Sequence, residues 1–181
     1  GLGPQSLPSP SHNTLHDKPF TAPQNIHGGG GKIGDLIITW DTLPPQEQNA
    51  PGIHYKVFYR LHGKEGQSEW AGKLLKKEGN VGKAVIHFEK IDNYYTQYDV
   101  KVQAFNDIGA GPESNATVIY SAEDMPQVAP QSVWARGFNS TAINITWNPI
   151  DQRREMIRGK LLGHRVSFYS HFSSFLLILN F

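Results

Sequence analysis

The sequence repeats itself at a spacing close to the length of one small domain. Residues 17–26 read DKPFTAPQNI and residues 124–133 read DMPQVAPQSV, while LIITW ending at Trp40 matches INITW ending at Trp147. Both pairs are 107 positions apart, from 17 to 124 and from 40 to 147. This period is too long for a solenoid repeat and fits a whole β-sandwich module. The repeat therefore predicts a tandem array of modules.

A third match predicts where the modules begin and end. GLGPQS at residues 1–6 resembles GAGPES at residues 109–114, and such glycine–proline corners lie between strands. We therefore expect the chain to be part of a longer protein that contains several modules. The expected divisions are the tail and linker of a preceding module (1–18), a complete module (19–124), the N-terminal part of a following module (125–166) and an atypical apolar tail (167–181).

Composition favours an all-β fold. Twelve prolines and eighteen glycines, with four Trp, seven Tyr and nine Phe, favour short strands joined by many turns. A net charge of +1 argues against nucleic acid or an anionic membrane surface as the main partner. The absence of cysteine excludes disulfides, cysteine-ligated zinc and thiol nucleophiles.

Alternating apolar and polar residues predict seven short strands in the complete module. Leu36, Ile38 and Trp40 share one face, and Tyr98 and Val100 continue the same alternation further along. Seven strands separated by turn signals predict a two-sheet Greek-key sandwich. The strands are expected at residues 23–27, 36–40, 53–59, 68–75, 83–91, 97–105 and 115–122. The core of the two modules is expected to include Trp40, Tyr55, Val57, Tyr98, Val100, Val102 and Trp147.

These residues resemble the fibronectin type III family, whose fold is an immunoglobulin-like sandwich. The resemblance rests on Trp40, on HYKVFY at 54–59 and on YDVKVQAFNDIGAGPES at 98–114. It implies that Tyr98 makes the corner hydrogen bond back to the backbone. GDLIITWDTLPPQEQNAPGIHYKVFYR, VIYSAEDMPQVAP and MIRGKLLGHRV are further similar to the membrane-proximal repeats of contactins, with neuroglian-type receptors next.

No motif in the sequence supports catalysis or a cofactor. Residues 29–34 satisfy G-x-G-x-x-G, but a β-pattern follows where dinucleotide binding needs a helix, so we expect a turn. Lys32 is followed by Ile33 and not by Ser or Thr, which excludes a Walker loop. The histidines show no metal-binding spacing, and no GxSxG occurs. We expect no metal, no cofactor and no enzymatic activity.

Three sequons predict glycosylation on the secretory route. They are Asn115-Ala116-Thr117, Asn139-Ser140-Thr141 and Asn144-Ile145-Thr146. Asn144 alternates with apolar neighbours and should point outward, and Asn139 falls in a turn. Chance occurrence of such short motifs is the alternative.

Basic residues gather in two places. Lys73, Lys76, Lys77 and Lys83 form a candidate heparan-sulfate contact, which would be salt-sensitive. A second group lies in QRREMIRGK at residues 152–160. Ordinary solvated loops are the alternative for both groups.

The apolar tail departs from the repeat. His164 stands where the complete module has Tyr55, and FLLIL at 175–179 is far shorter than the roughly 20 residues of a transmembrane helix. The tail could be a strand, a truncated anchor signal or sequence translated from outside the normal reading frame, and we favour the last. Without its remaining strands the following module should expose Trp134, Ile143, Ile145 and Trp147.

The sequence favours a non-catalytic, extracellular cell-adhesion segment that spaces and presents binding surfaces at neuronal or axonal contacts. The expected partners are cell-surface or matrix proteins, bound homophilically or heterophilically, and the longer protein would be lipid-anchored or single-pass. One alternative is the ectodomain of a receptor enzyme such as a receptor tyrosine phosphatase. Another is an intracellular muscle array, which the sequons disfavour.

Overall fold

A computed structural model describes residues 1, 3–11, 14–64, 66–75, 82–90, 92–170 and 173–179. Within them, eight strands build a central sandwich. These are β1 (Gln24–Gly28), β2 (Asp35–Asp41), β3 (His54–Leu61), β4 (Ala71–Leu75), β5 (Lys83–His87), β6 (Gln97–Phe105), β7 (Ala110–Glu113) and β8 (Thr117–Tyr120). One-turn helices α1 (Pro45–Gln48) and α2 (Arg154–Ile157) lie in loops. The remaining strands are β9 (Gln131–Gly137), β10 (Ile143–Asn148), β11 (His164–Ser170) and β12 (Ser173–Leu179).

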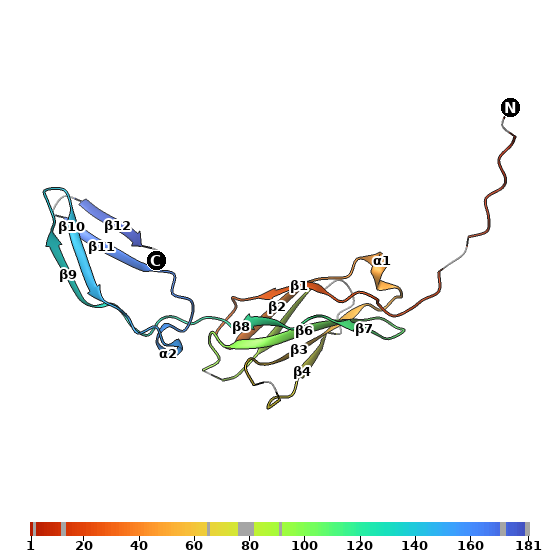
Figure 1. Cartoon of the computed structure of the whole chain (residues 1–181), viewed down its shortest axis with the longest axis horizontal. Helices are drawn as coiled ribbons and strands as arrows, with labels where there is room; N and C mark the ends of the chain where they lie inside the picture. Colours follow the sequence, from red (N-terminus) through yellow and green to blue (C-terminus); the bar gives the residue numbers. More distant parts are fainter. Residues whose placement is uncertain are drawn as a thin grey trace.

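The central sandwich consists of two antiparallel sheets. One has the order β1-β2-β5, and the other has the order β4-β3-β6-β7, with β8 also paired to β6. Figure 1 shows this sandwich in the middle of an elongated chain, with the N-terminal segment on one side and β9–β12 on the opposite side. The predicted all-β, fibronectin-type sandwich is confirmed. The glycine-rich stretch forms the expected turn between β1 and β2, where Gly34 has a φ of 90° that other residues rarely adopt.

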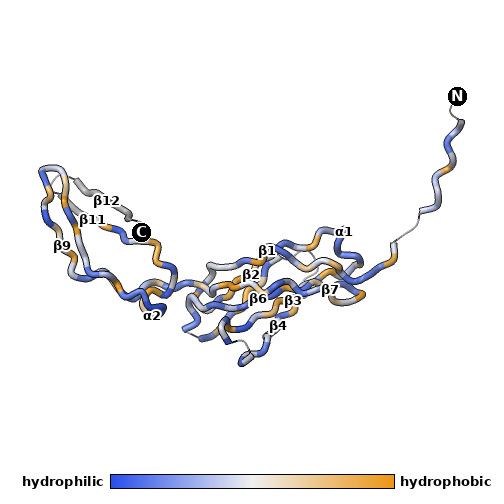
Figure 2. Tube along the Cα trace, in the orientation of Figure 1, coloured by the Kyte–Doolittle hydropathy of each residue, from blue (hydrophilic) through white to orange (hydrophobic). Residues whose placement is uncertain are grey.

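Alternate residues of each strand fill the space between the two sheets. Figure 2 shows hydrophobic positions interspersed with hydrophilic ones along these strands. Tyr55, Val57, Val100 and Val102 are at most 1% exposed. The buried cluster consists of Leu36, Ile38, Trp40, Leu43, Tyr55, Val57, Ala84, Ile86, Tyr98, Val100, Val102, Ala104 and Ile119. All of the expected core residues of the complete module therefore lie in its interior.

The corner at residues 109–114 contains a short strand, although its glycine and proline indicate only a turn. Residues 110–113 form β7, which pairs with the C-terminal half of β6, while β8 pairs with the N-terminal half. Ser114 separates the two because its hydroxyl accepts the Val102 amide hydrogen at 2.9 Å. One edge of β6 is thus covered by two short strands where the sequence predicts one.

Tyr98 fixes the crossover, but by a different bond from the one that the family resemblance implies. Its hydroxyl donates to the side-chain Oδ1 of Asn93 at 2.5 Å, not to the backbone. The backbone carbonyl of Asn93 instead accepts from the Ser121 hydroxyl at 3.0 Å. Asn93 therefore connects the start of β6 with the end of β8. The expected hydrogen bond from Tyr98 to the backbone was wrong. Burial raises the pKa of Tyr98 to about 12.

The C-terminal strands form two separate hairpins and leave apolar residues uncovered. β9 pairs with β10, and β11 pairs with β12. Trp134 is 65% exposed and Ile143 is 57% exposed, as the sequence predicted. Trp147 differs from its expected core position because it is only half-buried. Its one described ring contact is with His164, at 5.3 Å between centroids.

The contact between Trp147 and His164 repeats one in the central sandwich. Trp40 and Tyr55 lie at the corresponding positions of the repeat, with ring centroids 5.5 Å apart. His164 therefore replaces Tyr55 in the same contact between strands of two different sheets. Of the possibilities left open for residues 167–181, the structure forms a strand, β12, in register with β11 from Ser170↔Ser173 to His164↔Leu179.

Candidate functional site: the joint between two modules

The loop that contains α2 packs against the end of the central sandwich. Figure 1 shows α2 between the sandwich and the C-terminal hairpins. Ile157, on this helix, is only 4% exposed. Arg158 ends the helix in the left-handed conformation, with a φ of 56°, and turns the chain back toward the linker. We call the contacts between this loop and the sandwich the joint.

Arg154 makes the most extensive contact across the joint. Its guanidinium donates to the carbonyls of Asp92 and Tyr94 at 2.5 and 3.0 Å, and to the Thr96 hydroxyl at 2.7 Å. These three acceptors lie in one loop of the central sandwich, about sixty positions earlier in the chain. A planar guanidinium suits this task because its donors have a fixed geometry. Arg154 thus bridges two modules through one rigid group.

The Tyr94 ring forms the surface on which both arginines of the helix lie. The Arg154 and Arg158 guanidinium carbons are 4.5 and 4.7 Å from its centroid. Tyr94 itself is only 5% exposed. A cation over an aromatic face contributes about 0.5–1 kcal/mol at exposed sites and more when water is excluded. The arginines therefore stabilise the joint by packing as well as by hydrogen bonds.

The linker completes the joint through Asp124. Its carboxylate accepts from Arg158 at 2.7 Å, and its amide donates to the Arg158 carbonyl at 2.9 Å. The hydrogen bond from Arg158, aided by one from the Met125 amide, lowers the pKa of Asp124 below its ordinary value. The carboxylate consequently stays ionised through the neutral range.

The other end of the central sandwich has the same backbone contact without the arginines. Asp17 corresponds to Asp124 in the repeat, and its amide donates to the carbonyl of Asn49 at 3.2 Å. Asn49 ends α1 with a φ of 58°, as Arg158 ends α2. The side-chain contacts of Arg154 and Arg158 are thus an addition to a shared backbone arrangement.

The sequence did not predict this joint. QRREMIRGK was interpreted as solvated or heparan-binding, but Arg154 and Arg158 point into the preceding module. Only Arg153 of the three arginines fits the solvated interpretation, since it pairs with Asp151 in its own loop and is 69% exposed. A signal existed in the repeat, because α2 occupies the place of the LPPQEQNAPG connection.

The structure leaves all three sequon asparagines exposed. Asn115 lies between β7 and β8, and Asn144 lies on β10 opposite Arg136. Asn139 is in the turn between β9 and β10, where its Oδ1 accepts from the amide and the hydroxyl of Thr141.

The lysine group is only partly described. Lys73 and Lys83 are exposed on β4 and β5, and the Lys73 ammonium donates to the Val85 carbonyl at 2.8 Å. These two lysines thus lie where the edges of the two sheets meet. Lys76 and Lys77 fall outside the described residues.

Within the described part of the chain, no group of three potential ligands could hold a metal ion, and no helix is long and apolar enough to span a membrane. A scan against protein-family models found no match.

Comparison with known proteins identifies the family. The chain is 57% identical to Contactin of Drosophila melanogaster over 169 residues, which are 93% of this chain and 12% of that protein. The chain is a fibronectin type III segment of a contactin-like protein. Human Contactin-2 is 34% identical over 93% of the chain, and the chain spans 16% of its length. Chicken Neuronal cell adhesion molecule is 33% identical over the same share, and the chain spans 12% of its length.

A solved structure supports the fold of this contactin-like chain. The crystal structure of the chicken CNTN1 FN1-FN3 domains matches with a TM-score of 0.66 and 27% identity, over 96% of this chain and 57% of that one. The predicted resemblance to fibronectin type III repeats of contactins is therefore confirmed.

Proposed function

We propose that this segment is a non-catalytic, extracellular spacer of a cell-adhesion protein, and that it sets the angle between successive fibronectin modules. The observation that carries the proposal is the position of Arg154, whose guanidinium has three acceptors in the preceding module. Modules joined by a bare linker move freely by default. The Arg154 guanidinium is partly exposed, but its three hydrogen bonds and its contact with the buried Tyr94 ring restrict that motion. Binding surfaces elsewhere in the protein are thereby held at a defined separation.

The family supports adhesion over the receptor-enzyme alternative. The relatives reported above are contactins and a neuronal cell adhesion molecule. The proposed partners are proteins on the same or an opposing cell surface, bound homophilically or heterophilically. Attachment to the membrane, by a lipid or a single span, would belong to other parts of the protein.

A weak glycosaminoglycan contact is a further proposed interaction. The exposed lysines Lys73 and Lys83 lie at the meeting of two sheet edges, and Lys76 and Lys77 are close to them in sequence. Such a contact would depend on charge density and would weaken as salt increases.

Bead aggregation with a complete ectodomain tests the adhesive role. Deleting residues 19–124 should reduce aggregation, because the flanking modules lose their spacing and the joint. Replacing the same residues with an unrelated fibronectin module is the matched control: it restores the spacing but removes the Arg154 acceptors at residues 92–96, so it should recover aggregation only in part. If deletion leaves aggregation unchanged, the proposed role is wrong.

A further inference from the structure

A groove runs between β1 and β8, the strands that form one open side of the sandwich. Among the described residues β1 pairs only with β2 and β8 only with β6, so the two strands are adjacent without a ladder between them. The two strands lie close together at Gly28, where an added Cβ would lie 2.6 Å from the Ile119 side chain.

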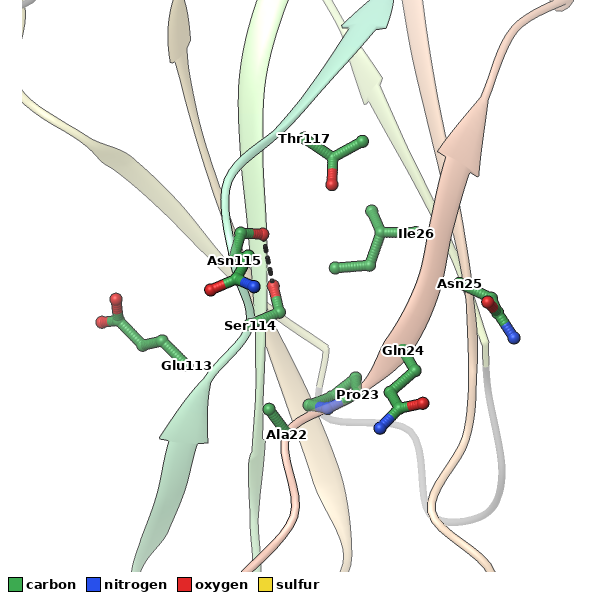
Figure 3. A pocket seen from close by; sticks show the side chains of 9 residues that line it. All are labelled: Ala22, Pro23, Gln24, Asn25, Ile26, Glu113, Ser114, Asn115 and Thr117. Carbon is green, nitrogen blue, oxygen red and sulfur yellow. Dashed lines mark hydrogen bonds between the residues drawn. The ribbon is translucent and has the colours of Figure 1, made fainter.

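A hollow of about 390 Å³ lies beside them, and it is lined by residues 22–26 on one side and by Glu113, Ser114, Asn115 and Thr117 on the other. This volume is within the range of about 300–1,000 Å³ that small-molecule clefts occupy. Figure 3 shows Ile26 and Thr117 projecting into the space between the two ribbons, with Pro23 at its lower end. Gln24 and Glu113 add an amide and a carboxylate at the margins.

One lining residue of the groove is the sequon asparagine Asn115. Its position is fixed by Ser114, whose hydroxyl donates to the Asn115 carbonyl at 3.1 Å and accepts from the Val102 amide at 2.9 Å. Ser114 is 8% exposed, so Asn115 is attached directly to the core strand β6. Asn139, by contrast, is in a turn and bonds only locally among the described residues, to Thr141 and to the Ala142 carbonyl.

We propose that the first N-acetylglucosamine of an N-linked glycan on Asn115 occupies the groove between β1 and β8. The proposal rests on the extracellular assignment made above. A pyranose has an apolar face and a rim of hydroxyl and amide groups. The apolar face fits Pro23 and Ile26, and the polar rim fits the Gln24 side chain and the Thr117 hydroxyl. The attached sugar needs no diffusive encounter, since its anchor is already part of the groove.

The consequence of this arrangement is protection of two strand edges. Unpaired edges offer backbone N–H and C=O groups to other chains, and proteins commonly cover them. β1 already carries one such device, an irregularity between Gln24 and His27 in its pairing with β2. A bulky, solubilising glycan over the remaining opening blocks edge pairing between copies of the protein.

Hydrogen–deuterium exchange on the full chain, secreted from insect cells, tests the proposal. Intact mass should show a glycan on Asn115, and the β1 amides should exchange several-fold more slowly than in Asn115→Gln. Trimming every glycan to one N-acetylglucosamine with an endoglycosidase should preserve that slowing without any sequence change. Asn139→Gln is the matched control and should leave β1 exchange unaltered.

Four results would overturn the proposal. If Asn115 carries a glycan but β1 exchange is unchanged, the glycan does not occupy the groove. If the slowing disappears when the glycans are trimmed to one N-acetylglucosamine, the first sugar is not the part that protects β1. An unmodified Asn115 beside modified Asn139 or Asn144 overturns this inference alone. If all three asparagines of the secreted protein are bare, the sequon support for the extracellular proposal fails as well.

Discussion

Replacing Tyr98 by Phe tests how the sandwich fixes its crossover. The substitution keeps the ring, which is stacked on Phe88 at 5.1 Å, and removes only the hydroxyl that donates to Asn93. The lost hydrogen bond contributes about 0.5–1.5 kcal/mol net, and an acceptor left buried without a partner costs about 1–3 kcal/mol. Since Asn93 is 5% exposed, we expect the free energy of unfolding to fall by about 1–3 kcal/mol.

Urea unfolding of the full chain, followed by circular dichroism, measures this change. Tyr59→Phe is the matched control, because the Tyr59 hydroxyl makes no hydrogen bond with the described residues; its effect should stay within about 0.5 kcal/mol. In a double-mutant cycle with Asn93→Ala, the two changes should be strongly non-additive. If Tyr98→Phe changes stability no more than Tyr59→Phe does, the assignment of the crossover to this bond is wrong.

Three other predictions concern charge. Burial alone would raise the pKa of Asp99, but hydrogen bonds from His62 and Arg60 outweigh it and lower the pKa. Stability should therefore fall as pH decreases below about 4, and less steeply in Asp99→Asn, in urea melts at successive pH values. The pKa of folded Tyr98 is about 12 against an ordinary 10.0, so stability should also decline as pH rises from about 10 to about 12. This decline should be smaller in Tyr98→Phe but not absent, because burial also raises the pKa values of Tyr55 and Tyr95. Charge reversal of Lys73, Lys76 and Lys77 should abolish retention on heparin at low salt; undiminished retention would contradict the proposed contact.

Alternation in the sequence predicted most strands because burial on one face of a sheet imposes a period of two. The 107-residue repeat likewise predicted that Trp40 and Trp147 lie on equivalent strands, which are β2 and β10. β7 was missed because its Gly and Pro indicate a turn, and only pairing with β6 makes it a strand. The one-turn helices α1 and α2 are four residues each, too short for a helical period to appear.

The joint could not be predicted because its contacts are tertiary. Nothing local distinguishes Arg154, which bridges modules, from Arg153, which bonds within its own loop. Likewise, the family resemblance indicated a hydrogen bond for Tyr98 but not that a side chain, Asn93, would accept it. The groove between β1 and β8 could not be predicted either, because it depends on the distance between two strands that no sequence pattern indicates.

The central claim is that the Arg154 contacts hold two modules at a fixed angle. The chain contains no cysteine, so cysteines introduced at the exposed positions Val85 and Val133 can be spin-labelled selectively. Pulsed dipolar spectroscopy should give one narrow distance distribution for this labelled chain and for Arg153→Ala, and a clearly broader one for Arg154→Ala. An equally broad distribution in all three proteins would contradict the claim.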